Sequence, residues 1–256
     1  MWWDDQRTTS ELFQASLEGD YDDEAAWDAV RALRPRNTDE VFQAALDHTR
    51  SADTRERARG LDVLAQLGAG RPESERRHFD ERVRIAIKHL HDSDPLVVHA
   101  AAWALSHLGG ETAVSELIGM RNNPDPGVRW AIANGLNGSE RADAIATIVG
   151  LMDDPDDNVR DWATFALGTQ CPVDSLDIRE ALRKRLGDSY EEARVEAVWG
   201  LAQHKDPQGI RLLIERLSAD GWTAGDEMAA ADTLDVSCDT PAEKLVAGLR
   251  RLLEAK

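Results

Sequence analysis

The sequence predicts an all-α protein, a right-handed α-solenoid of about seven helical hairpins closed by a C-terminal capping helix. Three observations predict this fold. An apolar template recurs seven times along the chain, turns rich in helix-capping residues separate the copies, and the alternating β-branched patterns of strands are almost absent. Because one hairpin cannot bury its apolar stripe alone, we expect neighbouring hairpins to stack on one another.

The repeated template is clearest in three copies, which begin at Val97, Val128 and Val159. Counted from these valines, apolar or small residues occupy positions 0, +3, +4, +7 and +8, which is one face of an α-helix. This spacing assigns Trp162, at +3 of the third clear copy, to the core. Weaker copies begin at Ala25, Glu56, Ala193 and Asp226.

A second amphipathic segment precedes each template helix, so that two helices form each repeat. The clearest of these first helices span residues 83–90, 113–120, 142–152, 178–186 and 209–217. The connecting turns carry helix-start signals. Asp94 and Asp125 each stand at a predicted N-cap and are followed by proline, which needs no backbone donor at the first helical position.

These elements predict a single solenoid domain over residues 1–256. Residues 1–36 form an acidic N-terminal capping repeat, and residues 37–235 contain the remaining repeats. The longest interval between copies holds a polar stretch with two glycines near its start and a proline after them, which predicts a loop insertion at 68–78. A final helix at 241–255 caps the C-terminal end.

The turn chemistry resembles a known family. A helix–turn–helix unit with Asp-Pro in the turn, then Val-Arg and a run of small residues ending in Leu, resembles the HEAT repeat. It is most similar to the bacterial HEAT-like class first named for phycobilisome lyases, over roughly residues 20–235. The resemblance implies the fold but no single activity, because such repeats occur in scaffolds, lyase subunits, DNA glycosylases and hydroxylases.

Regularly spaced charges predict a structural ladder between repeats. Aspartate recurs at position −3, at Asp22, Asp53, Asp94, Asp125 and Asp156. Arginine recurs at position +1, at Arg57, Arg129, Arg160 and Arg194. The resemblance to HEAT repeats implies that the arginine of one repeat binds the aspartate of its neighbour, and charge-assisted hydrogen bonds of this kind would hold the stacking register.

Positions +2 and +6 of the second helices lie outside the buried stripe and are the candidate binding face. The candidate contact residues are His99, Trp103, Trp130, Asn134, Asp161, Phe165, Val195 and Trp199. Exposed aromatic residues beside polar groups are typical of binding hot spots. The alternative is that these aromatic residues are half buried and form the core between repeats. Trp130 beside Asn134 is the best single contact candidate.

Composition excludes several partners. The chain has 48 acidic and 30 basic residues, a net charge of −18, which disfavours nucleic acid and anionic membranes. Acidic residues gather in 1–30 and 204–240, as expected for polar capping repeats or for steering a basic partner.

Two cysteines and an acidic start at Met1-Trp2-Trp3-Asp4-Asp5, where a signal peptide would be basic, predict a cytoplasmic protein. We also expect a monomer.

Sequence motifs for chemistry are weak. His89, His91, His99 and His107 cluster in sequence, but their spacing favours structural roles over a metal site. The diiron hydroxylases of this class need His-Glu dipeptides, which the sequence lacks. Cys171 and Cys238 lack a nucleophile pattern and are expected to be buried. We therefore predict no catalytic residue, no metal and no cofactor.

The sequence as a whole predicts a non-enzymatic protein-interaction scaffold that binds a protein or peptide with basic and apolar surface on its concave face. A narrower form of this hypothesis, by analogy with bacterial HEAT-like proteins, is an inhibitor or immunity protein that covers a basic toxin. The alternative is a phycobilin lyase-like or chaperone subunit whose aromatic residues cradle a tetrapyrrole. Trp103, Trp130 and Trp199 would suit stacking on such a ring system.

Overall fold

The chain folds into helices joined by turns. The structure, a computed structural model, describes residues 5–219 and 221–255, and the predicted acidic start at Met1–Asp4 lies outside them. The described residues form fifteen α-helices and no strand, which confirms the all-α class. No helix in this part of the chain is long and apolar enough to cross a membrane.

The chain divides into two compact units, 1–135 and 136–256. The single continuous domain expected from the sequence stays a prediction.

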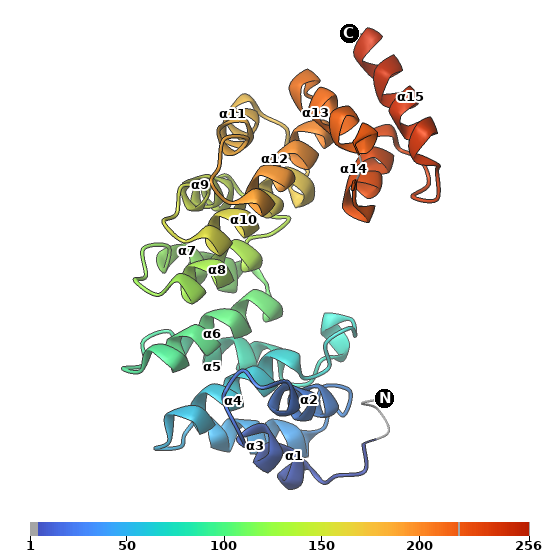
Figure 1. Ribbon diagram of the computed structural model, residues 1–256. Coiled ribbons are helices and arrows are strands. Elements are labelled where there is room, and N and C mark those ends of the chain that lie inside the picture. The colour runs from blue at the N-terminus through green and yellow to red at the C-terminus, as the bar shows by residue number, and fades with distance from the viewer. Residues whose placement is uncertain (1–4, 220, 256) are drawn as a thin grey trace. The chain divides into compact units, whose positions relative to one another are not determined.

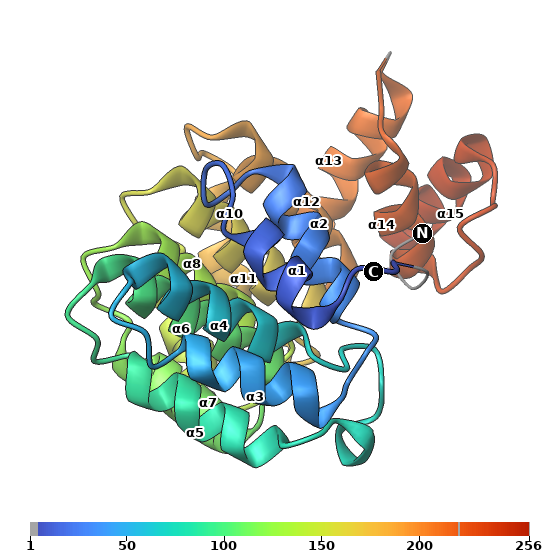
Figure 2. The same ribbon diagram turned by 90° about the horizontal axis from the view of Figure 1, so that it is seen from below.

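The N-terminal unit contains four helical hairpins (Figure 1). Its helices are α1 (Thr9–Ser16), α2 (Glu24–Leu33), α3 (Asp39–His48), α4 (Thr54–Gln66), α5 (Phe79–His89), α6 (Pro95–Leu108), α7 (Glu111–Gly119) and α8 (Pro126–Gly135). A short 3₁₀ turn, Glu73–Glu75, lies in the predicted loop insertion. Figures 1 and 2 both place α1 and α2 on the side of α4 that faces away from α5.

The C-terminal unit contains three hairpins and a final helix. Its helices are α9 (Ala142–Leu151), α10 (Asp157–Phe165), α11 (Leu176–Arg185), α12 (Glu191–Gln203), α13 (Pro207–Ser218), α14 (Ala224–Leu234) and α15 (Ala242–Glu254). A π-helical turn, Ala166–Gln170, continues α10. Gly168 in this turn packs directly against Gly200 of α12, so neither position has room for a side chain.

The apolar template accounts for the core of most second helices. In α6 all five template positions are buried, and the same holds for the apolar positions of α8. Small residues at +3, such as Ala100 and Ala131, allow neighbouring helices to approach closely. The repeated spacing therefore identified the buried face of these helices correctly.

Two template assignments were wrong. In α2 the buried residues are Ala26, Ala29, Val30 and Leu33, so the repeat begins one residue later than the assigned Ala25, which is exposed. Asp23 rather than Asp22 is accordingly the N-cap residue. Trp162 is half-buried rather than core. Its indole is much larger than the alanine that stands at this position in α6 and α8, and it packs edge-on against Phe165, with ring centroids 5.6 Å apart.

The aspartates at −3 cap their own helices and do not form the ladder. Asp53, Asp94 and Asp156 each accept a hydrogen bond from a backbone N–H in the first turn of the helix that follows. Asp125 accepts one from the N–H of Gly127 in the same way. These carboxylates satisfy donors at a helix N-terminus, which is why they recur at this position.

The arginines at +1 instead bind the turn before their own helix. Arg57, Arg129, Arg160 and Arg194 each donate from Nη1 to two consecutive carbonyl oxygens of that turn, over 2.7–3.3 Å. Each arginine therefore closes its own interhelix turn. This role is the same in all four repeats and needs no neighbouring aspartate.

The carboxylates that join neighbouring repeats stand at −5. Arg57 forms a bidentate pair with Asp92 of the next repeat, at 3.1 and 3.2 Å. Arg160 forms the same pair with Asp188, with both bonds at 2.9 Å. Asp92 and Asp188 also accept the backbone N–H of the residue at −3. The ladder thus exists, but its acidic partner is two residues earlier than predicted.

Loss of a ladder pair should cost more stability than loss of turn contacts alone. We expect Arg160→Ala to lower the free energy of unfolding by about 1–3 kcal/mol, because Asp188 loses a partner while largely buried. Arg194→Ala is the matched control, because the equivalent −5 position of the following repeat is Gly221, which has no carboxylate. Urea unfolding would measure both, and equal losses would contradict an inter-repeat role for Arg160.

Candidate functional site

A buried charged cluster joins the first hairpin to α4. The Arg59 side chain is 0% exposed and donates to the carbonyl oxygens of Ser16 (2.9 Å) and Tyr21 (2.7 Å). It also donates to Asp62 Oδ2 at 3.0 Å. The Tyr21 hydroxyl donates to the same carboxylate oxygen at 2.5 Å. One guanidinium thus ties the α1–α2 connection to the second helix of the next repeat.

Aromatic rings complete this cluster. The guanidinium carbon of Arg59 lies 4.3 Å from the centre of the Tyr21 ring and 5.1 Å from that of Trp27. Both distances are within the range of cation–π attraction. Burial raises the pKa of Asp62 to about 7, although Arg59 and the Tyr21 hydroxyl act in the opposite direction.

A cavity of about 240 Å³ opens beside this cluster in the N-terminal unit. Four aromatic side chains line it, from the loop before α2 (Tyr21), from α2 (Trp27), from α6 (Trp103) and from α8 (Trp130). Trp27 and Trp103 meet edge to face, with ring centroids 5.3 Å apart. The remaining lining residues are Asp22, Asp62, Leu96, His99 and Ala100.

Three of the predicted contact residues therefore lie around one cavity: His99, Trp103 and Trp130. All three are half-buried. Asn134 lies outside the lining and donates from Nδ2 to Ser106 Oγ at 3.0 Å. Asp62, which the helical spacing assigns to the exposed +6 position, is 2% exposed, because the first hairpin covers this part of α4.

Sequence reasoning missed Tyr21 and Arg59. Arg59 occupies position +3 of its repeat, where the clear copies at 97 and 128 carry alanine. A charged residue at a position that should be buried was the available signal that a partner must lie nearby. Tyr21 carried no comparable signal, because its partner Asp62 is 41 residues away in the sequence.

The predicted face of the C-terminal unit is built differently. Asp161, Phe165, Val195 and Trp199 are all half-buried. The Trp199 indole donates from Nε1 to Asp226 Oδ1 at 2.9 Å and packs against Gly225 at the start of α14. For Trp199 the structure supports the alternative interpretation, in which the aromatic ring belongs to the contact between repeats.

Two carboxyl groups in this unit each have one oxygen that is buried without a hydrogen-bond partner. Oδ1 of Asp161 and Oε2 of Glu196 are both buried and unpaired. Burial raises the pKa of Asp161 to about 6, with further contributions from Glu192 and Asp188. Burial, and then the charge of Asp161, raises the pKa of Glu196 to about 8. Both groups therefore favour the protonated form more than free carboxyl groups do.

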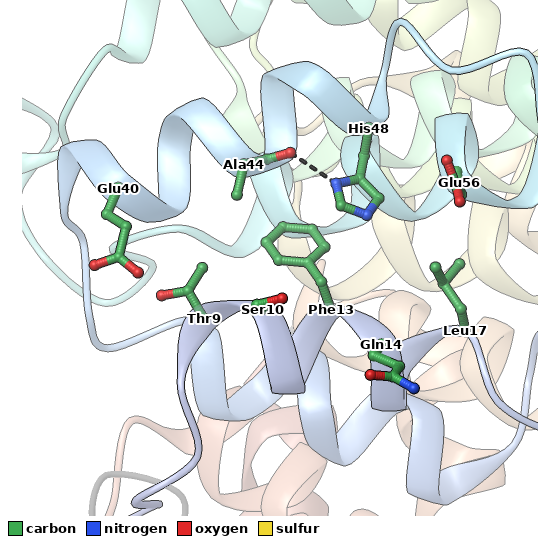
Figure 3. Close-up of a pocket in the computed structure, with 9 residues that line it drawn as sticks. All are labelled: Thr9, Ser10, Phe13, Gln14, Leu17, Glu40, Ala44, His48 and Glu56. Atoms are coloured by element: carbon green, nitrogen blue, oxygen red, sulfur yellow. Dashed lines mark hydrogen bonds between the residues drawn. The ribbon is translucent and has the colours of Figure 1, made fainter.

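Further cavities lie elsewhere in the described residues. One, of about 430 Å³, lies between α1 and α3, where Phe13 stacks on His48 with ring centroids 4.3 Å apart (Figure 3). The His48 ring is held by a 2.8 Å contact from Nδ1 to the carbonyl of Ala44. Another, of about 510 Å³, is lined by residues that include Cys171, Asp174 and His204.

His89, Cys171 and Cys238 lie in different surroundings in the structure. His89 bonds to the carbonyl oxygens of Ile85 and Thr49, at 2.8 and 3.0 Å, in agreement with the structural role favoured for it. Cys171 is buried, as expected, but Cys238 is exposed, which corrects the expectation for that thiol. Cys238 lies in the connection between α14 and α15.

Comparison with known proteins identifies the family. A family model for HEAT repeats matches residues 50–137, 117–178 and 146–235. The chain belongs to the HEAT-repeat family. Repeats of this family generally serve as scaffolds for protein interaction, and the fold resembles that of Kap95p in its structure with RanGDP. That likeness has a TM-score of 0.61 at 12% identity and covers 96% of this chain and 40% of that one.

Two bacterial HEAT-like proteins are also similar. Protein YibA of Escherichia coli K12 is 38% identical over 60 residues, which span 23% of this chain and only 21% of YibA. The YibA structure matches with a TM-score of 0.72 at 22% identity, over 98% of this chain and 94% of that one. The CpcE–CpcF complex of the phycocyanin lyase from Nostoc sp. PCC7120 matches at 0.52 and 19%, over 98% and 95%. Below 25% identity these structural likenesses extend to the fold alone.

The Arg59 cluster should dominate the stability of the first hairpin. Arg59→Ala would leave Asp62 buried without its charged partner, and we expect a loss of about 3–5 kcal/mol in the free energy of unfolding. Arg50→Ala is the control, because that arginine pairs with Asp47 at the exposed surface, where the loss should stay within about 0.5 kcal/mol. Thermal or urea unfolding that shows similar losses for both variants would contradict this role.

Glu196 should make stability depend on pH. Its pKa is about 8 in the folded protein, above the unfolded value, so its contribution is favourable at low pH and is lost as the pH rises toward 8. The side chain of the Glu196→Gln variant stays neutral at every pH. As the pH rises from 5 to 8.5, we therefore expect the free energy of unfolding of this variant to increase by about 2 kcal/mol relative to that of the parent. Glu215→Gln, at an exposed position of α13, should show no such gain. A constant difference between Glu196→Gln and the parent across this range would refute the prediction.

Proposed function

We propose that this HEAT-repeat protein is a non-enzymatic interaction module. It binds a protein or peptide partner with basic and apolar surface through the second helices of its N-terminal unit. The observation that carries the proposal is the cavity lined by Tyr21, Trp27, Trp103 and Trp130 beside acidic groups. Large aromatic side chains in a partly enclosed pocket are the usual anchors of binding energy at protein interfaces.

Charge supports a basic partner. The chain carries a net charge of −18, and Asp22 stands exposed at the edge of the cavity. A negative surface of this kind accelerates association with positively charged partners and repels acidic ones. The narrower hypothesis of an inhibitor or immunity protein for a basic toxin fits the same charge and is part of this proposal.

The cavity supports a side chain as occupant better than a tetrapyrrole. Its volume, about 240 Å³, is below the roughly 300–1,000 Å³ that small-molecule sites usually have. Trp199, which a tetrapyrrole was expected to contact, is engaged with Asp226. The likeness to a phycocyanin lyase therefore adds no support for chromophore binding by this chain.

Trp130 should be the test residue for partner binding. We expect Trp130→Ala to weaken binding of a captured and purified partner by about 2 kcal/mol, measured by calorimetry, because a half-buried indole at the cavity would be lost. Trp222→Ala removes an exposed tryptophan of the C-terminal unit and should leave the affinity unchanged. Binding of the partner should also weaken as salt is added. A partner that binds both variants equally would overturn the assignment of this face.

A further inference from the structure

The cavity of the N-terminal unit has the composition of a cation-binding cage. Four aromatic rings line it, from Tyr21, Trp27, Trp103 and Trp130, and they come from four separate segments of the chain. We propose that this cavity binds a quaternary ammonium group, such as the head group of a trimethylated lysine side chain or of choline. The inference rests on the proposed function, because it names the chemistry that the binding face recognises.

The rings already hold one cation of the protein itself. The Arg59 guanidinium lies over Tyr21 at 4.3 Å and near Trp27 at 5.1 Å, on the buried side of the cluster. The electron-rich faces of these aromatic rings therefore attract positive charge here, as aromatic cages do for alkylated ammonium ions. Trp103 and Trp130 extend the same aromatic lining beyond Trp27 toward α8.

The charges around the cavity favour a second cation. Asp62 and Asp22 both line it and carry two negative charges when ionised, against the single positive charge of Arg59. Asp22 is exposed, so it adds attraction at the entrance without a buried counter-charge. At pH values above the Asp62 pKa of about 7 both carboxylates are ionised, and these three groups then carry a net charge of −1 that attracts an arriving cation.

Hydrogen bonding explains why an alkylated ammonium fits better than a primary one. Oδ2 of Asp62 already accepts bonds from Arg59 and from Tyr21, and Asp62 is only 2% exposed. A lysine ammonium brings three N–H donors that must all be satisfied once it leaves water. A quaternary ammonium has no N–H donor, so contact with aromatic faces leaves no hydrogen bond unmade.

Size sets the form of the ligand. A volume of about 240 Å³ is small for a whole cofactor but sufficient for one compact head group with part of its chain. Two sources share this chemistry: a trimethyllysine side chain of a protein partner and a free small molecule such as choline. The experiment below separates them.

The test uses the full chain and small cations of known charge. Tetramethylammonium and choline are titrated by calorimetry and by NMR of the indole N–H signals, with sodium chloride matching the ionic strength. We expect saturable binding that shifts a subset of the indole signals. The neutral isostere of choline, 3,3-dimethylbutan-1-ol, should bind at least about tenfold more weakly, because it lacks the charge that the rings attract.

Matched variants locate the site. Trp130→Ala should weaken tetramethylammonium binding at least about fivefold, and Asp22→Asn at least about twofold. Asp22 is exposed and does not cap α2, so its variant keeps the fold even if Trp130→Ala does not. Trp222→Ala and Asp232→Asn, both at exposed positions of the C-terminal unit, should bind as the parent does.

The outcomes separate this inference from the proposed function. Three outcomes would contradict the proposed quaternary ammonium site. These are absence of saturable binding, equal binding of the neutral isostere, and unchanged tetramethylammonium affinity in Asp22→Asn. If the cage fails while a protein partner still requires Trp130, the proposed function stands alone. If tetramethylammonium binds but no partner depends on Trp130, the proposed function fails and the cage stands. If peptides with trimethyllysine bind at least tenfold more tightly than choline, the natural ligand is a side chain of a protein partner. If choline binds at least tenfold more tightly than these peptides, the natural ligand is a free small molecule.

Discussion

The structure depends on one constraint, that no helical hairpin can bury its apolar face without a neighbour. In four repeats the arginine at +1 orders the turn between the two helices by donating to two carbonyl oxygens of that turn. Where the next repeat supplies a carboxylate at −5, as in Asp92 and Asp188, the same guanidinium also joins the neighbours. Turn closure and repeat stacking therefore share a single side chain, which makes the stacking register specific.

The candidate site follows from a departure from this regular stacking. In the second repeat the buried +3 position is Arg59, a charge that must find partners inside the protein. Its partners are the carbonyl oxygens of Ser16 and Tyr21 in the first hairpin and the carboxylate of Asp62 in α4 itself. Trp27 of the same hairpin meets Trp103 of α6, and both rings line the cavity together with Trp130. Stability and the candidate site thus rest on the same cluster.

The two units use equivalent helix positions for different purposes. In the N-terminal unit the tryptophans line a cavity, whereas in the C-terminal unit Trp199 bonds to Asp226 and supports packing. In the C-terminal unit one carboxyl oxygen each of Asp161 and Glu196 is instead buried without a hydrogen-bond partner. Membership of the HEAT-repeat family explains the shared framework, but the function must come from the side chains that each repeat presents.

The sequence by itself determined the features that depend on local spacing. Helix hairpins, aspartate caps and most of the buried stripe of α6 and α8 follow from residues a few positions apart, so they could be predicted. The acidic partners of the ladder, the burial of Arg59 and the role of Trp199 could not. Each depends on contact with a residue of another repeat, and the hydrogen-bonded partners are 27 to 43 residues apart in the sequence. Tertiary structure alone decided them, because spatial neighbours set whether a side chain is buried, paired or open to a ligand.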